Sequence, residues 1–144
     1  MEHKTIVIAA DHAGFELKEF LRTSLKDAAK SIQDLGTDSL ESVDYPILAY
    51  RLAGFIERGD AEMGILICGS GIGISIAANR SLSVRAALCR DIEDATMARS
   101  HNDANVLALS GRSTNREKAL SIARVFFDTS FEGGRHLRRV AQLS

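Results

Sequence analysis

The sequence has no tryptophan, a single proline and only two cysteines among its 144 residues. Because Cys68 and Cys89 form no Cys-x-x-Cys pair, they indicate neither a disulfide framework nor a structural zinc site. No apolar run approaches the roughly 20 residues that span a bilayer, and the short run at 5–10 lacks a secretory pattern. We therefore expect a cytoplasmic protein with reduced thiols and no membrane partner.

An excess of one charge sign is also absent, since 18 basic side chains stand against 19 acidic ones. The resulting net charge of −1 predicts no bulk attraction to nucleic acid, although a local basic pocket is compatible with it. The four histidines, at positions 3, 12, 101 and 136, form no His-x-x-x-His pair, so we expect no metal site. The length fits a single domain over 1–144, and an apolar content of 45% is ordinary for a globular core.

The chain does have a regular alternation of short apolar runs and amphipathic stretches. Strands are expected over about 4–10, 31–36, 62–69, 84–89 and 104–111. Helices are expected over about 13–28, 46–58, 73–80, 92–100, 115–128 and 133–143, the last of which closes the chain. This alternation through short links predicts an α/β fold, a three-layer α/β/α sandwich with a five-stranded parallel sheet of Rossmann-like type.

Polar residues follow several of the expected strands at their carboxyl ends, where parallel sheets of this kind form their sites. Asp11 and His12 follow the first strand, the segment 68–71 ends the third, and the segment 110–112 ends the fifth. Asp11 could also be the N-cap of the next helix, a role that is compatible with a place in a site.

Cys68 stands where the third strand meets three glycines at alternate positions, Gly69, Gly71 and Gly73. This spacing differs from the dinucleotide-binding fingerprint, and no Walker lysine follows, so a nucleotide cradle is the weaker interpretation. Amides of such a loop can hold a negatively charged oxygen, and the helix N-terminus just beyond stabilises a thiolate. Cys68 is therefore a candidate base or nucleophile, with a buried structural cysteine as the alternative. Cys89 has no glycine loop after it and is expected in the core.

Arginines gather in the last expected helix. Arg135 and Arg139 are four residues apart and share a helical face, where they could grip a phosphate or remain solvated. The packed face of this helix is expected to hold Leu137, Val140 and Ala141.

His101 and Asn102 lie between a helix and the fifth strand, where they could join a site or remain on the surface. Together with the thiol, the glycine loop and the arginines, they suggest an anionic substrate and proton-transfer chemistry. The residues by themselves do not name the reaction.

Five segments, in one order along nearly the whole chain, give the sequence a resemblance to a known family. They read AADHAGFELK at 9–18, DYP at 44–46, ILICGSGIGISIAANR at 65–80, RSHNDANVLALSGR at 99–112 and EGGRHLRRV at 132–140. On these motifs the sequence is similar to the type B ribose-5-phosphate isomerases, whose relatives act on galactose 6-phosphate and allose 6-phosphate. The cysteine–glycine loop and the paired arginines are the most specific of the five.

The resemblance implies interconversion of ribose 5-phosphate and ribulose 5-phosphate through an enediolate, without a metal or a cofactor. It implies that Cys68 moves the proton between C1 and C2 and that Ser70 helps to move the proton between O1 and O2. His101, with the assistance of Asp11, would open the furanose ring. Substrate contacts are implied for His12, Tyr45, Gly69, Gly71, Gly73, Asn102, Arg112, Arg135 and Arg139, with His12 and the three arginines on the phosphate.

The same resemblance implies a homodimer or a homotetramer whose site lies at a subunit interface. Two alternatives stay open beside the ribose 5-phosphate isomerase. One is an isomerase of a six-carbon sugar phosphate, and the other is a binding module for phosphorylated ligands without catalysis.

Overall fold

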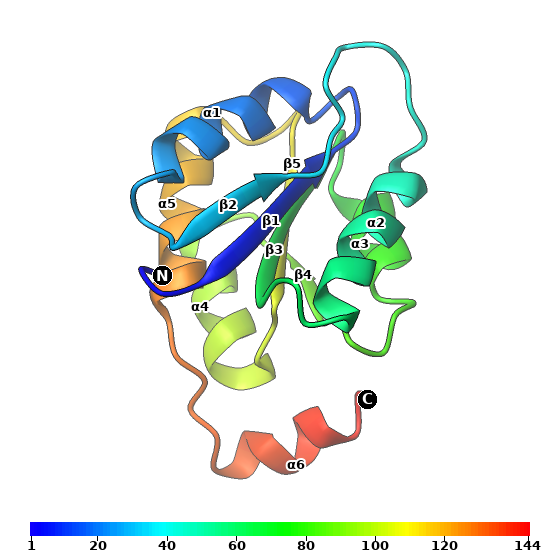
Figure 1. Ribbon diagram of the computed structural model, residues 1–144. Helices are drawn as coiled ribbons and strands as arrows, with labels where there is room; N and C mark the ends of the chain where they lie inside the picture. The colour runs from blue at the N-terminus through cyan, green and yellow to red at the C-terminus, as the bar shows by residue number, and fades with distance from the viewer.

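Strands and helices alternate along the whole chain. The structure is a computed structural model that describes residues 1–144. Its five strands are β1 (Thr5–Ala10), β2 (Ser31–Asp34), β3 (Met63–Cys68), β4 (Ala86–Leu88) and β5 (Val106–Ser110). Its six helices are α1 (Phe15–Leu25), α2 (Tyr45–Glu57), α3 (Ile72–Ala78), α4 (Ile92–Asn102), α5 (Arg116–Asp128) and α6 (Arg135–Ala141). All neighbouring strands pair in parallel, so the predicted α/β architecture with a five-stranded parallel sheet is confirmed (Figure 1).

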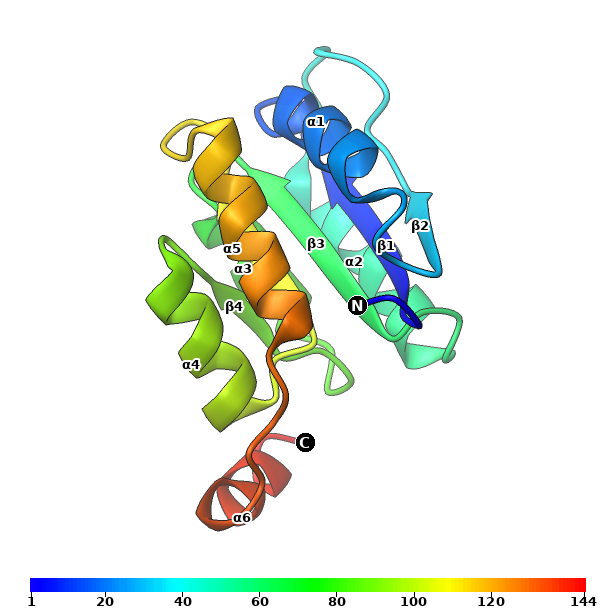
Figure 2. The ribbon, with the colours of Figure 1, turned by 90° about the vertical axis from the view of Figure 1, so that its left-hand side faces the viewer.

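The central strand β3 is buried on both faces, because helices cover both sides of the sheet. Ile65 and Ile67 point into the apolar layer shared with α1, α4 and α5. Leu66 and Cys68 point the other way, into the layer shared with α2 and α3. Figure 2 shows α1, α4 and α5 on the near face of the sheet, with α2 and α3 behind it. The sulfur of Cys68 therefore lies on the α2–α3 side, at the end of its strand.

The strand order β2-β1-β3-β5-β4 differs from the order along the chain. From β1 the chain moves outward to β2 and then crosses back to β3 on the other side of β1. The loops that leave β1 and β3 therefore diverge, and open α/β sheets form their binding crevices at such a point. The backbone N–H of Asp11 donates to the carbonyl of Ile67 over 3.1 Å, which joins the two loops at their base.

Local residue types determine where the helices begin. Pro46 lies in the first turn of α2, as predicted, where its missing N–H needs no partner. Asn115 caps α5 by accepting a backbone hydrogen bond over 2.8 Å. Asp11 does not cap α1, because its Oδ1 accepts from the N–H groups of Ala13 and Gly14, and Gly14 is the N-cap. Asp11 instead orders the turn ahead of that helix.

The C-terminal helix differs from its prediction in its start and in its packed face. α6 begins at Arg135 rather than at 133, because the two preceding glycines have φ values of +68° and +53°. Leu137 and Ala141, expected on the packed face, are exposed, and only His136 and Val140 are buried. The reason is that α6 packs on the end of α4, beyond the amino ends of the strands, and not on the sheet (Figure 1).

The two edge strands are shorter than their predictions, with β2 covering 31–34 and β4 covering 86–88. Each of them pairs on one side only, so fewer hydrogen bonds extend it. None of the six helices combines the length and the apolar character that crossing a bilayer requires.

Candidate active site

The carboxyl ends of β1 and β3 open onto a cavity of about 400 Å³. The loops after β1, β3 and β5 and the first residue of α2 form its wall. The lining residues are Asp11, His12, Ala13, Tyr45, Cys68, Gly69, Ser70, Ile72, Gly73 and Arg112. The predicted site residues from four separate segments of the chain thus meet in one place.

Cys68 ends β3 at this cavity and is 4% exposed. The N–H of Gly71 donates to its Sγ over 3.2 Å. Gly71 has a φ of +78°, and a Cβ at this position would lie 2.9 Å from the carbonyl of Leu109, so only glycine fits the turn. A donor that faces the sulfur stabilises negative charge on it, and this suits a group that removes protons.

Tyr45 and Ser70 bring two hydroxyl groups to the cavity. The ring of Tyr45 packs directly on Gly73, where a Cβ would lie 2.5 Å from the ring carbon Cζ. The Oγ of Ser70 accepts a hydrogen bond from the N–H of Ile72 over 3.1 Å. This contact leaves the hydroxyl hydrogen of Ser70 free to donate to a ligand.

The residues after β1 supply a carboxylate and an imidazole. The Asp11 carboxylate is nearly buried and is held by the two N–H groups of its own turn. The Nδ1 of His12 accepts a hydrogen bond from the N–H of Val43 over 3.2 Å, which assigns the ring proton of the neutral imidazole to Nε2. The loop between β2 and α2 therefore fixes the tautomer of His12 and leaves it a donor to offer.

Arg112 supplies the guanidinium of the cavity. Its backbone is anchored because the N–H groups of Gly111 and Arg112 donate to the carbonyls of Cys68 and Gly69 at 2.9 and 3.2 Å. The guanidinium lies against the backbone of Gly69 and forms no ion pair with a carboxylate. An unpaired guanidinium in the same cavity as His12 makes an anion site that suits a phosphate.

Two buried groups outside the cavity have structural roles. Cys89 lies in the core, as predicted, and burial raises the pKa of its thiol to about 12. Lys18 is fully buried, and its Nζ lies 2.8 Å from carboxylate oxygens of both Glu19 and Asp34. The sequence pattern did not single out Lys18, since its partner Asp34 comes from β2 and meets it only in the folded chain.

The remaining predicted site residues lie at the opposite edge of the sheet. His101 and Asn102 are the last two residues of α4, shortly before β5 begins. Arg135 and Arg139 lie on α6, beyond the amino ends of the strands (Figure 1). A strand of six residues such as β3 is roughly 20 Å long, so these side chains do not reach the cavity of their own chain.

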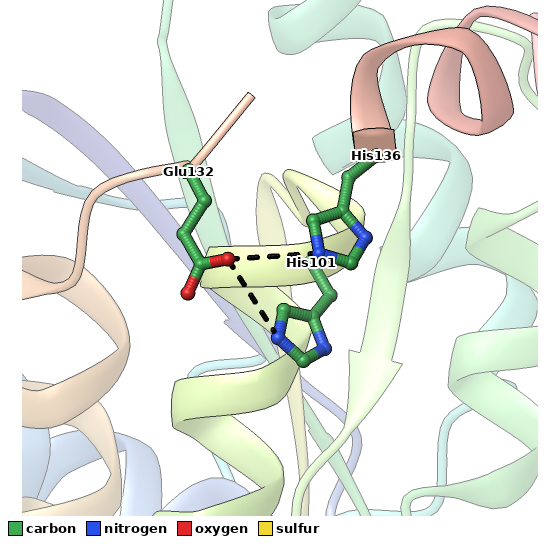
Figure 3. A group of neighbouring side chains, drawn as sticks. All are labelled: His101, Glu132 and His136. Atoms are coloured by element: carbon green, nitrogen blue, oxygen red, sulfur yellow. Dashed lines mark ion pairs between the residues drawn. The ribbon is translucent and has the colours of Figure 1, made fainter. Parts of the chain in front are cut away.

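His101 belongs to a cluster with Glu132 and His136 that the sequence did not predict (Figure 3). The rings of His101 and His136 stack with their centroids 4.3 Å apart and an interplanar angle of 13°. The Oε2 of Glu132 lies 3.9 Å from the Nε2 of His101 and 3.6 Å from the Nε2 of His136. Burial, reinforced by His101 and Arg135, lowers the pKa of His136. The spacing of four residues between Glu132 and His136 can be read from the sequence. Only the fold, however, places this pair beside His101.

Several large apolar side chains are exposed on the two helices next to the cavity. They lie on α2, on α3 and just beyond α3, and they are Ile47, Tyr50, Ile72, Ile76 and Leu82. Ile72 also lines the cavity itself. Because α2 and α3 pack side by side, these exposed groups belong to neighbouring helices beside the cavity.

Comparison with known proteins shows which family the chain resembles over nearly its whole length. A sequence model of the family described as Ribose/Galactose Isomerase matches residues 6–143. The chain is 40% identical over 141 residues to ribose-5-phosphate isomerase B of Escherichia coli, covering 98% of this chain and 95% of the relative. A crystal structure of a ribose 5-phosphate isomerase from Thermotoga maritima has a TM-score of 0.95 at 48% identity, over 99% of this chain and 98% of that one. The ribose 5-phosphate isomerase B of Anaplasma phagocytophilum has a TM-score of 0.94 at 43% identity, over 100% and 99% of the two chains.

Proposed function

This chain belongs to the ribose/galactose isomerase family, and on that premise we propose that it interconverts ribose 5-phosphate and ribulose 5-phosphate. Relatives of nearly full-length similarity carry the name ribose-5-phosphate isomerase B. The observation that carries the proposal is the position of Cys68, whose sulfur receives the Gly71 N–H in the cavity that also holds the unpaired Arg112. The cavity thus holds both a candidate base, Cys68, and a candidate phosphate site at Arg112. Isomerisation of a sugar phosphate requires both, because the phosphate must be held while a carbon-bound proton is removed.

The proposed reaction is a pair of proton transfers. The Cys68 thiolate removes the proton from C2 of the open-chain aldose, and the electron pair of that bond moves toward O1 to form an enediolate. The hydroxyl of Ser70 and the amides of the glycine loop donate to the oxygens as their negative charge grows. Ser70 passes a proton between O2 and O1, and the Cys68 thiol returns its proton to C1, which leaves the ketose and the original thiolate.

The other cavity residues hold the substrate in place. Arg112 and the Nε2–H of His12 bind the phosphate, and Tyr45 contacts the sugar. Asp11, fixed by its own turn, faces the ring oxygens and assists ring opening. Binding the phosphate places the reacting carbons against the sulfur, which converts binding energy into orientation. Because each step moves only protons, the proposed chemistry needs no metal and no cofactor.

A second copy of the chain completes the site in this proposal. His101, Asn102, Arg135 and Arg139 project from the far edge of their own chain, while the cavity lies beside exposed apolar side chains of α2 and α3. A two-fold dimer that covers those side chains brings the arginines and His101 of one chain to the cavity of the other. The protein is accordingly a homodimer, or a homotetramer built from such dimers.

The test of the reaction is a coupled isomerase assay with ribose 5-phosphate in the presence of a chelator. We expect turnover that the chelator does not reduce. Galactose 6-phosphate and allose 6-phosphate serve as competing substrates in the same assay. A kcat/KM at least tenfold higher for a six-carbon substrate would reassign the substrate, and binding without any turnover would indicate a non-catalytic module.

The shared site is tested by mixing two impaired variants. In a two-fold dimer each site takes Cys68 from one chain and Arg139 from the other. At ribose 5-phosphate concentrations well below the raised KM, Cys68→Ala and Arg139→Ala chains should each retain little activity, whereas mixing and reassembly should restore about a quarter of the sites. No recovery after verified subunit exchange would show that Arg139 of one chain does not serve the cavity of the other.

A further inference from the structure

We propose that His136 is a positioning residue that holds both His101 and Arg135 in the arrangement the reaction requires. The inference rests on the proposed function, in which His101 opens the sugar ring and Arg135 binds the phosphate. Neither the fold nor the reaction explains why a histidine is buried at this position. The contacts of its ring explain it.

The face of the His136 ring supports His101. The two rings are nearly parallel, at 13°, with centroids 4.3 Å apart (Figure 3). The side chain of His136 is only 8% exposed, whereas that of His101 is 30% exposed. The buried ring is thus the fixed partner, and the more exposed ring lies against it. A flat support restricts rotation of the His101 side chain and so fixes the direction in which its nitrogens face.

The edge of the His136 ring holds Arg135. The Nε–H of Arg135 donates to the Nε2 of His136 at a distance of 3.4 Å. Only a neutral imidazole with its proton on Nδ1 can accept this hydrogen bond. Burial, reinforced by the neighbouring His101 and Arg135, lowers the pKa of His136 and so favours a neutral ring. One side chain therefore orients the two groups that act on opposite parts of the substrate.

Glu132 ties the cluster to α4 and balances its charge. Its backbone N–H donates to the carbonyl of Ser100 over 3.0 Å, and its carboxylate lies 3.6 and 3.9 Å from the two Nε2 atoms. The charged or titratable groups that act on His136 are thus His101, Glu132, Arg135 and Arg139. The negative charge of Glu132 opposes the positive charges that Arg135 and Arg139 bring to His136.

A metal ion fits this cluster poorly, although two imidazoles and a carboxylate are donors that zinc accepts. The lone pairs of the two rings lie in nearly parallel planes, so they do not converge on one point. Arg135 and Arg139 also place positive charge beside any bound cation. The geometry therefore favours a role in which His136 supports His101 and Arg135 over one in which the cluster coordinates a metal ion.

Two substitutions separate the two contacts. His136→Phe keeps a flat ring beneath His101 and removes the acceptor for Arg135. We expect its KM for ribose 5-phosphate to rise about tenfold with little change in kcat, because a hydrogen bond to a charged group is lost. His136→Ala removes both contacts, and its kcat for ribose 5-phosphate should also fall about tenfold. His3→Ala, at the exposed amino terminus, is the matched control.

A second readout distinguishes loss of positioning from general damage. Ribulose 5-phosphate cannot close a furanose ring, because its O5 carries the phosphate, so exchange of its C1 proton with D₂O needs Cys68 but no ring opening. At saturating ketose, His136→Ala should exchange this proton within about twofold of the parent rate while isomerisation of ribose 5-phosphate stays slow. Equal losses in both reactions, or no loss in either, would overturn the proposal, as would tight zinc binding that disappears in His136→Ala.

Failure of the proposed function is recognised separately. If the parent protein isomerises no sugar phosphate, the proposed function fails before any variant is compared. The stack can still be measured by NMR, because the ring current of His136 shifts the ring protons of His101 upfield. His136→Phe should preserve that shift and His136→Ala should abolish it. An unchanged His101 spectrum in His136→Ala would contradict the positioning role in either case.

Discussion

The backbone N–H of Gly71 donates a hydrogen bond to the Sγ of Cys68 over 3.2 Å, so the loop after β3 folds back on the residue that ends the strand. In the same turn Gly71 has a φ of +78°, which favours glycine. The backbone conformation of one residue therefore decides which groups surround the sulfur.

Gly71→Ala should reduce both stability and activity. The new Cβ would occupy a left-handed conformation and would lie 2.6 Å from Leu88 Cδ1 and 2.9 Å from the Leu109 carbonyl. Gly59→Ala is the matched control, because Gly59 has a φ of +77° and nothing within 4 Å of its Cβ position. The control should lose about 1–2 kcal/mol of unfolding free energy in urea, and Gly71→Ala should lose clearly more, with a lower kcat. Equal losses would show that the contacts at Gly71 are unimportant.

Cys68→Ala should abolish proton transfer at carbon but leave ligand binding intact. Removing a general base commonly lowers the rate by about 10²- to 10⁴-fold. Exchange of the ribulose 5-phosphate C1 proton with D₂O should therefore slow by about 10²-fold or more. Binding of the sugar phosphate, measured by calorimetry, should remain within a few-fold of the parent. Cys89→Ala, in the core, is the control for the loss of a thiol. Exchange at the parent rate in Cys68→Ala would remove this residue from the mechanism.

Alkylation should distinguish the two cysteines. Burial raises the pKa of the Cys89 thiol to about 12, so this side chain stays protonated and unreactive at neutral pH. Cys68 lines the cavity and should be the residue that iodoacetamide modifies, with inactivation in step with a single added group. Ribose 5-phosphate should slow the modification. Peptide mapping that finds the label on Cys89 in the folded protein would contradict this assignment.

Arg112→Ala should weaken phosphorylated ligands selectively. Loss of a charge-assisted contact of about 1.5–3 kcal/mol should raise KM for ribose 5-phosphate by roughly 10- to 100-fold. Binding of unphosphorylated ribose should hardly change. Arg90→Ala is the control, because Arg90 lies in a neighbouring cavity with Lys118. If ribose and ribose 5-phosphate lose affinity equally, Arg112 does not bind the phosphate.

The lowered pKa of His136 should make the protein less stable in mild acid. Burial, followed by His101 and Arg135, opposes protonation in the folded state, whereas the unfolded chain takes up that proton near the usual value of 6.5. The stability contributed by neutral His136 is therefore present above pH 6.5 and is lost as the pH falls below it. Urea unfolding at fixed protein concentration should show a smaller loss from pH 7 to pH 5 in His136→Phe than in the parent. The same loss in both proteins would disprove this linkage.

The alternation of apolar runs and amphipathic stretches determined the fold class, because a parallel sheet buried on both faces needs continuous apolar strands and helices to cover them. Pro46, where the second helix was expected to begin, lies in the first turn of α2 for the local reason that its missing N–H needs no partner there. The residues at the carboxyl ends of β1, β3 and β5 could be placed at one edge, since all strands of a parallel sheet end on the same side.

Only the tertiary structure decided the strand order, the stack of His136 on His101 and the separation of Arg135 from Cys68. These relationships join segments that are far apart in sequence, and no local propensity or spacing encodes which of them meet. The misplaced packed face of α6 has the same cause, since helical periodicity shows that a helix has two faces but not which neighbour covers either one. Local chemistry thus determined the elements and their chemical groups, and long-range packing determined which groups act together.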